Sequence, residues 1–191
     1  MISILKMVFG KNMLKLEDTV LVIIDVQGKL AQIMYDRDTL FDNLQKIIKG
    51  AQLLNIPIIW NEQIPDKLGP TIPEIKNLLP DIQPLPKVCF SCCGNENFMQ
   101  RLRDLNRNQI LLVGIETHVC VYQTAVDLID LGYEVQVVAD AVSSRTLENK
   151  QIGLEKMKEY GASLTSVETA LFELLKVAEG TKFKEIIKIV K

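Results

Sequence analysis

Short, continuous apolar runs recur along the chain. Five of them, at 19–25 (TVLVIID), 56–60 (IPIIW), 108–114 (NQILLVG), 133–140 (YEVQVVAD) and 162–167 (ASLTSV), are hydrophobic throughout rather than alternating. Continuous hydrophobicity over so few residues is typical of strands that are covered on both faces. We therefore expect five buried β-strands.

Segments with helical periodicity lie between these runs. In 38–54 the apolar residues recur every three to four positions and so form one stripe. Helices are also predicted over 95–105 with Asn95 as N-cap, over 119–131 and 147–160, which end at Gly132 and Gly161, and over 168–177. Strands that alternate with helices need a parallel sheet with helices on both faces, because parallel neighbours require long crossovers. The expected class is α/β, doubly wound.

The pattern weakens over 61–87, where six of the chain's seven prolines lie. We expect an irregular excursion with at most a short helix and a short strand near 83–88. Long excursions of this kind commonly form the wall of a pocket.

Composition limits the class of protein. A chain of 191 residues with 48% hydrophobic content fits one domain over 1–191, with 1–13 as an extension. The formal net charge is −2 and no basic block is interleaved with aromatics, so we expect a small-molecule partner and no nucleic acid. No apolar run is long enough to span a bilayer, so we expect no membrane insertion.

The four cysteines do not have disulfide-framework spacing, which favours a reducing, cytoplasmic location. Organelle targeting by the N-terminal stretch is the alternative. The cluster CFSCC (89–93) lacks the partner ligands that a structural zinc site needs, so we interpret it as pocket wall.

Three reactive side chains follow predicted strands. Asp25 ends the first run, Lys87 ends the proline-rich excursion, and Cys120 follows the run at 108–114. The ligand crevice of an open α/β sheet lies at the carboxyl ends of its strands, so the three could converge. Taken singly, each has another interpretation: a turn-forming Asp, a solvated Lys and a buried apolar Cys. Cys120 would begin a helix, where exposed backbone N–H groups favour a thiolate and could bind an oxyanion.

With VIIDVQ around Asp25, Lys87 after the prolines and GIETHVCV around Cys120, the chain resembles the isochorismatase-like cysteine hydrolases. The resemblance runs from about residue 13 to the C-terminus. VVADAVSSR (137–145) and YGASLTSVETALFELL (160–175) are similar to the isochorismatase domain-containing subgroup.

The resemblance implies a Rossmann-like three-layer sandwich with about six parallel strands and an Asp–Lys–Cys triad. Asp25 would be the general base, Lys87 would orient it, and Cys120 would be the nucleophile. A cis peptide would join Ile115 to Glu116, and the amides of Glu116 and Cys120 would form the oxyanion hole. We expect hydrolysis of a small amide, imide or carbamoyl compound through a thioester; the alternative is a non-catalytic binding or redox-sensing protein.

Other residues complete the expected site. Gln27, Trp60, Phe90, Ser91 and Tyr122 are candidates for the substrate pocket, although Trp60 and Tyr122 are equally compatible with a core position. The metal site of nicotinamidase-type members needs several histidines, but this chain has only His118, so we expect no metal and no cofactor. His118 is placed beside the site rather than in catalysis. The fold also suggests a homodimer or higher homo-oligomer.

Overall fold

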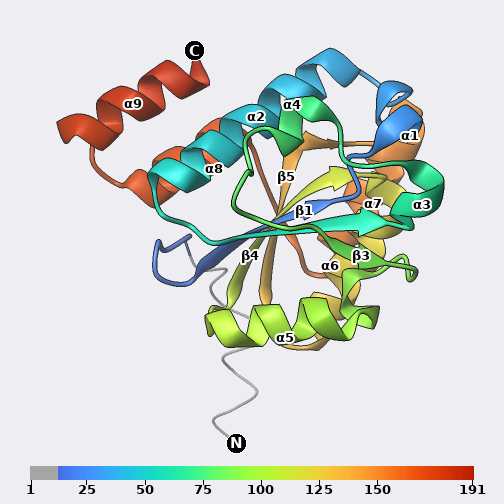
Figure 1. Cartoon of the computed structure of the whole chain (residues 1–191). Helices are drawn as coiled ribbons and strands as arrows, with labels where there is room; N and C mark the ends of the chain where they lie inside the picture. Colours follow the sequence, from blue (N-terminus) through green and yellow to red (C-terminus); the bar gives the residue numbers. More distant parts are fainter. Residues whose placement is uncertain (1–12) are drawn as a thin grey trace, which may run out of the picture.

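A computed structural model describes residues 13–191 (Figure 1). Six strands form one parallel sheet in the order β3-β2-β1-β4-β5-β6. The strands are β1 (Thr19–Ile24), β2 (Ile58–Gln63), β3 (Leu85–Lys87), β4 (Gln109–Ile115), β5 (Glu134–Ser143) and β6 (Ser163–Thr165). The predicted α/β class and the parallel six-stranded sheet are confirmed.

Helices connect the strands. They are α1 (Gly28–Gln32), α2 (Arg37–Leu53), α3 (Pro65–Leu68), α4 (Pro73–Lys76), α5 (Glu96–Leu105), α6 (Tyr122–Asp130), α7 (Leu147–Tyr160), α8 (Val167–Leu175) and α9 (Gly180–Val190). A 3₁₀ turn (Cys92–Gly94) precedes α5, and a π-helical turn (Thr117–Val121) precedes α6. Within the described residues, no helix is both long and apolar enough to cross a membrane.

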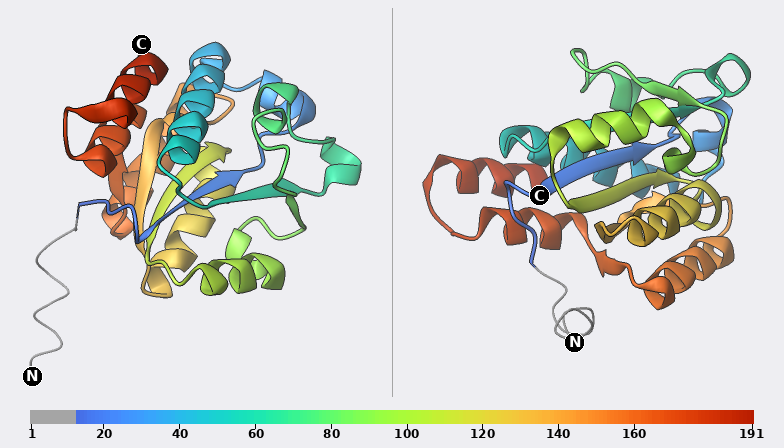
Figure 2. Two further views of the ribbon diagram at one scale, coloured as in Figure 1. Left: turned by 60° about the vertical axis from the view of Figure 1, so that its left-hand side comes forward. Right: turned by 90° about the horizontal axis from the view of Figure 1, so that it is seen from below.

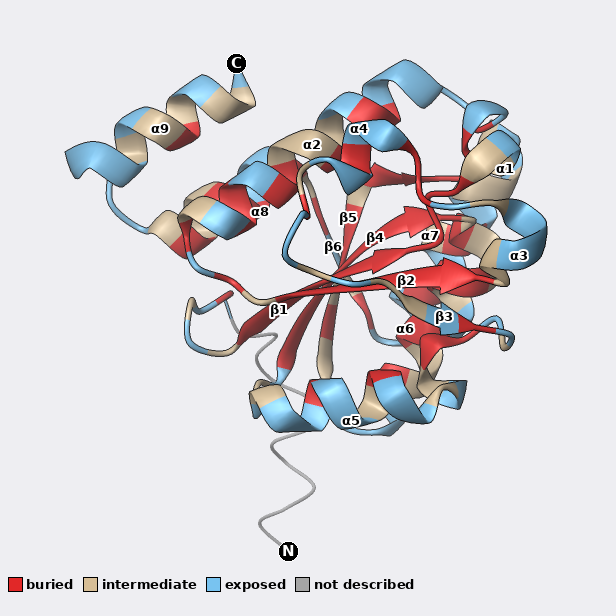
Figure 3. Cartoon of the chain, viewed as in Figure 1, coloured by how far each residue is buried: buried red, intermediate tan, exposed pale blue. Residues whose placement is uncertain are grey.

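The sheet separates two apolar cores. Figure 2 shows helices on both faces of the sheet, and Figure 3 shows that its central strands are buried. Side chains alternate between the two faces of a strand. In β1, Leu21 and Ile23 face the core under α2 and α8, whereas Val22 and Ile24 face the core under α5, α6 and α7. The two-sided burial explains why β1 is hydrophobic throughout.

The strand order reverses between β1 and β4, which are neighbours although β2 and β3 lie between them in sequence. In open α/β sheets a crevice forms at this switch point, outside the carboxyl ends of the strands. The segments that follow β1 and β4 begin at Asp25 and Glu116. The topology therefore brings the two predicted site segments to one place.

Several local expectations need correction. Cys120 lies in a π-helical turn and α6 starts two residues later, so the predicted helix over 119–131 begins too early. The excursion over 61–87 carries two short helices, α3 and α4, rather than one. Helices α1 and α9 were not predicted, although Phe183, Ile186, Ile187 and Val190 have helical spacing. All but one residue of the predicted extension 1–13 lie outside the described residues; Met13 is exposed.

Gly114 allows the two central strands to meet. Its φ is +120°, and a Cβ there would lie 2.1 Å from the carbonyl oxygen of Ile24. A real Cβ cannot approach a backbone oxygen so closely, and neither strand can move aside in the middle of a sheet. Ile24 directly precedes Asp25, so this contact also fixes the position of the Asp25 backbone.

We predict that Gly114→Ala lowers the free energy of unfolding by more than about 3 kcal/mol, because backbone strain and steric overlap add. Gly69→Ala is the matched control: its φ is also positive, at +79°, but its Cβ would meet nothing within 4 Å. The control should lose only about 1–2 kcal/mol. Urea unfolding of both variants measures the difference, and equal losses would show that the contact with Ile24 does not matter.

Candidate active site

Asp25, Lys87 and Cys120 are brought together by three different segments. Asp25 follows β1 with a left-handed φ of 55°, Lys87 is the last residue of β3, and Cys120 lies in the turn after β4. All three are buried, with exposed fractions of 2%, 3% and 8%. Buried ionisable side chains that gather at the carboxyl ends of parallel strands indicate a functional site.

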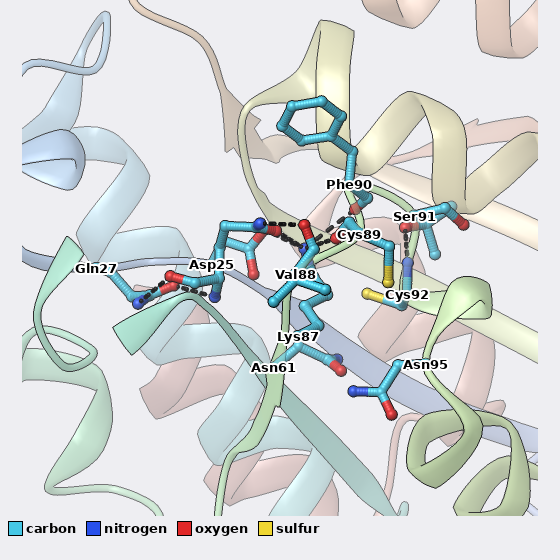
Figure 4. A network of polar contacts seen from close by, with 12 residues as sticks. Asp25, Gln27, Asn61, Lys87, Val88, Cys89, Phe90, Ser91, Cys92 and Asn95 are labelled. Carbon is cyan, nitrogen blue, oxygen red and sulfur yellow. Dashed lines mark hydrogen bonds and ion pairs between the residues drawn. The ribbon is translucent and has the colours of Figure 1, made fainter. Parts of the chain in front are cut away.

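The Lys87 ammonium is held by four oxygen acceptors (Figure 4). Its Nζ lies 2.7 Å from Asp25 Oδ2 and 2.6 Å from Gln63 Oε1. It also donates to the carbonyl oxygens of Cys89, at 3.2 Å, and Phe90, at 3.0 Å. A buried ammonium is tolerated only when its donors are satisfied, and here the chain after β3 curls back to supply the carbonyls.

Burial and ion pairing act on the two charges in opposite directions. Burial raises the pKa of Asp25 above 3.8, and the Lys87 charge and hydrogen bond only partly offset this rise. Burial alone would lower the pKa of Lys87, but the Asp25 carboxylate raises it above 10.5. The pair is therefore a fixed cation beside a carboxylate that takes up a proton more readily than an ordinary aspartate.

The Cys120 thiol is neutral at rest. Burial and the neighbouring Asp25 carboxylate raise its pKa to about 12, against a smaller opposite effect of Lys87. This corrects the expectation of a thiolate at a helix start, because Cys120 lies in a buried wide turn and faces a negative charge. Asp25 Oδ1 accepts no well-formed hydrogen bond from the described residues, so it is available to the thiol proton.

The turn that carries Cys120 is closed by the backbone of Glu116. The peptide bond between Ile115 and Glu116 is cis, at the position that the family resemblance implies. The Glu116 carbonyl accepts from the amides of Val119, at 3.1 Å, and Val121, at 3.2 Å. The Glu116 side chain pairs with Arg145, with Nε 2.7 Å from Oε1. The backbone and the side chain of Glu116 therefore both hold the turn in place.

Helix α7 supports the same turn from outside. A Cβ at Gly153 would lie 2.8 Å from both Thr117 C and His118 N, so only glycine allows this backbone contact. His118 Nδ1 lies 2.9 Å from Ser144 Oγ. His118 is therefore part of the packing around the turn. Neither Gly153 nor Gln63 was predicted from the sequence, because a lone helix glycine and a strand glutamine carry no local signal.

The predicted pocket residues are spread over different environments. Gln27 is fully buried and donates to the carbonyls of Gln63 and Gly69, while Ser91 accepts from the amide of Cys93. Trp60 lies inside β2 rather than at its end, packs in the α2 core and donates to Thr71 Oγ1. Phe90 is exposed beside Lys87, and Tyr122 is half-buried with Lys156 over its ring.

Known proteins share this chain's sequence and fold. The protein-family model of the isochorismatase domain matches residues 19–169 of this chain. The chain belongs to the isochorismatase family. A secreted isochorismatase effector, Isc1, of Phytophthora sojae is 41% identical over 179 residues, which cover 91% of this chain and 84% of that protein. Isochorismatase domain-containing protein 2 of Bos taurus is 36% identical over 173 residues, covering 91% and 83%.

Among solved structures, MAR1 ribonuclease from Caenorhabditis elegans has a TM-score of 0.87 and 34% identity, covering 94% of this chain and 92% of that one. Isochorismatase-family membership supports a hydrolase-type function for the chain. The names of these relatives differ in what they describe, so the family alone does not give the reaction.

We predict that the buried Asp25–Lys87 pair is strongly coupled. Lys87→Met should cost about 3–5 kcal/mol of unfolding free energy, because it leaves a buried carboxylate without its cation. The double variant Asp25→Asn/Lys87→Met should lose less than the sum of the two single variants. A double-mutant cycle by urea unfolding measures this coupling.

The Glu116–Arg145 pair is the matched control. Its N–O distance is also 2.7 Å, but 53% of the Arg145 side chain is exposed. Arg145→Met should cost at most about 1 kcal/mol. Additive losses at Asp25 and Lys87 would contradict the coupling.

Proposed function

We propose that this isochorismatase-family protein is a cysteine hydrolase that cleaves a small amide, imide or carbamoyl compound through a thioester on Cys120. Asp25 is the general base and acid, and Lys87 is the positioning cation. The observation that carries the proposal is the contact of the Cys120 thiol, whose pKa is raised, with the Asp25 carboxylate, whose Oδ1 accepts no other well-formed hydrogen bond from the described residues. A neutral thiol needs an adjacent base to become a nucleophile.

The first half-reaction forms the thioester. Cys120 Sγ attacks the carbonyl carbon while its proton moves to Asp25 Oδ1, and the carbonyl oxygen becomes an oxyanion. The oxyanion is stabilised by the backbone amides of Glu116 and Cys120. When the C–N bond breaks, Asp25 returns the proton to the leaving nitrogen.

The second half-reaction releases the acid. A water molecule attacks the thioester carbonyl as Asp25 takes its proton. When the C–S bond breaks, Asp25 returns this proton to Cys120 Sγ, which regenerates the thiol and the carboxylate. Lys87 remains charged throughout, because its pKa is raised and its donors are already satisfied. It keeps Oδ2 occupied, so that Oδ1 alone exchanges protons.

The rival function, a redox-sensing thiol without turnover, is less well supported. Oxidation-sensitive cysteines are accessible and have a low pKa. Cys120 is only 8% exposed and its pKa is raised to about 12. These properties suit a nucleophile that is activated only when substrate and base are together.

The setting of the protein follows from the same proposal. The substrate is a small molecule, with neither nucleic acid nor membrane as partner, and the triad needs no metal or cofactor. We place the protein in the cytoplasm as a homodimer or higher homo-oligomer. Phe90, which is 55% exposed beside Lys87, borders the substrate entrance.

We predict that Cys120→Ala and Cys120→Ser abolish turnover on a substrate found by screening amides, ureides and carbamoyl compounds. Mass spectrometry of the unmodified protein should show an acyl adduct on Cys120 during turnover. Cys93→Ala is the control, since Cys93 lies near the site but outside the triad, and it should retain activity. Full turnover by either Cys120 variant would refute the covalent mechanism.

The alkylation rate of Cys120 with iodoacetamide should rise with pH, by about tenfold per unit between pH 7 and pH 10. The reason is that the thiolate fraction grows tenfold per unit at any pH below the thiol pKa. Peptide mapping of the alkylated protein separates Cys120 from the other cysteines. A rate that levels off below pH 9 would contradict the raised pKa of the Cys120 thiol.

A further inference from the structure

A cavity lies beside β2, and none of the triad residues lines it. Its volume is about 520 Å³, and its wall is the proline-rich excursion between α3 and β3. It is lined by Trp60, Glu62, Lys76, Leu79, Ile82 and Gln83, together with several prolines. Small-molecule sites have volumes of about 300–1,000 Å³ and combine apolar walls with a few polar groups. The sequence predicted a pocket wall here, and the triad chemistry does not use it.

The cavity contains a buried carboxylate. Glu62 is 6% exposed, and its Oε1 accepts from the backbone amide of Thr71 at 2.7 Å. Among the described residues, no basic group lies within ion-pair distance of this carboxylate. Its second oxygen, Oε2, is not among the fully enclosed unpartnered atoms of the described residues, so it is open to the cavity and can accept from a bound ammonium.

Trp60 lines the same cavity next to Glu62. It lies two residues before Glu62 in β2, so both side chains point to the same face of the sheet. Its Nε1 donates to Thr71 Oγ1 at 2.8 Å, so Thr71 fixes both the indole and the carboxylate. Trp60 is 2% exposed, so its indole forms part of the cavity wall, and aromatic walls attract organic ammonium groups.

We propose that this cavity binds a small organic monoamine, with its ammonium on Glu62 and its apolar body against Trp60, Leu79 and Ile82. The exposed Lys76 at the rim disfavours a second positive charge on the ligand. The site is separate from the proposed hydrolysis and does not depend on it.

Strand β2 connects the two sites. Gln63 binds the ammonium of Lys87, whereas Glu62 faces the amine cavity. The negative charge of Glu62 also contributes to the raised pKa of Asp25.

Fluorescence tests the binding directly, because Trp60 is the only tryptophan of the chain. The unmodified protein is titrated with 2-phenylethylammonium chloride, and 2-phenylethanol is its neutral counterpart of equal size. We expect saturable change in Trp60 emission with a Kd of about 1 mM or tighter for the amine, and at least about tenfold weaker binding of the alcohol.

The variants separate charge from packing. Glu62→Gln keeps an oxygen for the Thr71 amide but removes the charge, and it should weaken amine binding at least about tenfold. Glu74→Gln removes an exposed carboxylate on α4 outside the cavity and should leave Kd unchanged. Should Glu62→Gln fail to fold, the amine-to-alcohol comparison on the unmodified protein still decides. Equal binding of amine and alcohol, unchanged binding in Glu62→Gln, or no saturation would overturn the proposal.

Discussion

The buried ion pair between Lys87 and Asp25 is the interaction on which the site depends. It joins the end of β3 at the sheet edge to the end of β1 at its centre, across β2. Gln63 from β2 and two carbonyls after β3 complete the shell of the ammonium. Because a buried charge without its partner costs several kcal/mol, the pair fixes both strand ends in one geometry.

The same pair gives the two oxygens of the Asp25 carboxylate different environments. Lys87 donates to Oδ2, whereas Oδ1 accepts no other well-formed hydrogen bond from residues 13–191 and is left for the Cys120 thiol. Burial raises the pKa of Asp25, so this oxygen is a better proton acceptor than that of an exposed aspartate. Gly114 fixes β4 against β1 at Ile24, and Gly153 allows α7 to pack on the turn that carries Cys120. The proposed chemistry therefore rests on a rigid carboxylate and a rigid thiol that approach from different strands.

The sequence predicted the strands, the long helices and the convergence of Asp25, Lys87 and Cys120 well, because these follow from continuous burial and from the rule for strand ends. Asn95 caps α5 as predicted, since its side chain accepts from two amides of the first turn. The protonation of Cys120 could not be predicted from the sequence. The pKa of the thiol depends on its burial and on its distance to Asp25, whereas the sequence around Cys120 indicated only the start of a helix. Gln63, Gly153 and the Glu62 cavity were missed for the same reason: their roles come from contacts between distant segments.

The most direct test of the account is the titration of the Asp25 carboxyl, followed by ¹³C NMR of the protein labelled at aspartate, with Asp25→Asn used to assign the signal. We predict a single Asp25 transition above the ordinary value of 3.8, because burial outweighs the effect of Lys87 on the pKa of this carboxyl. A transition below 3.8 would contradict the account, because Asp25 would then be a mere counter-ion and too weak a base for the thiol.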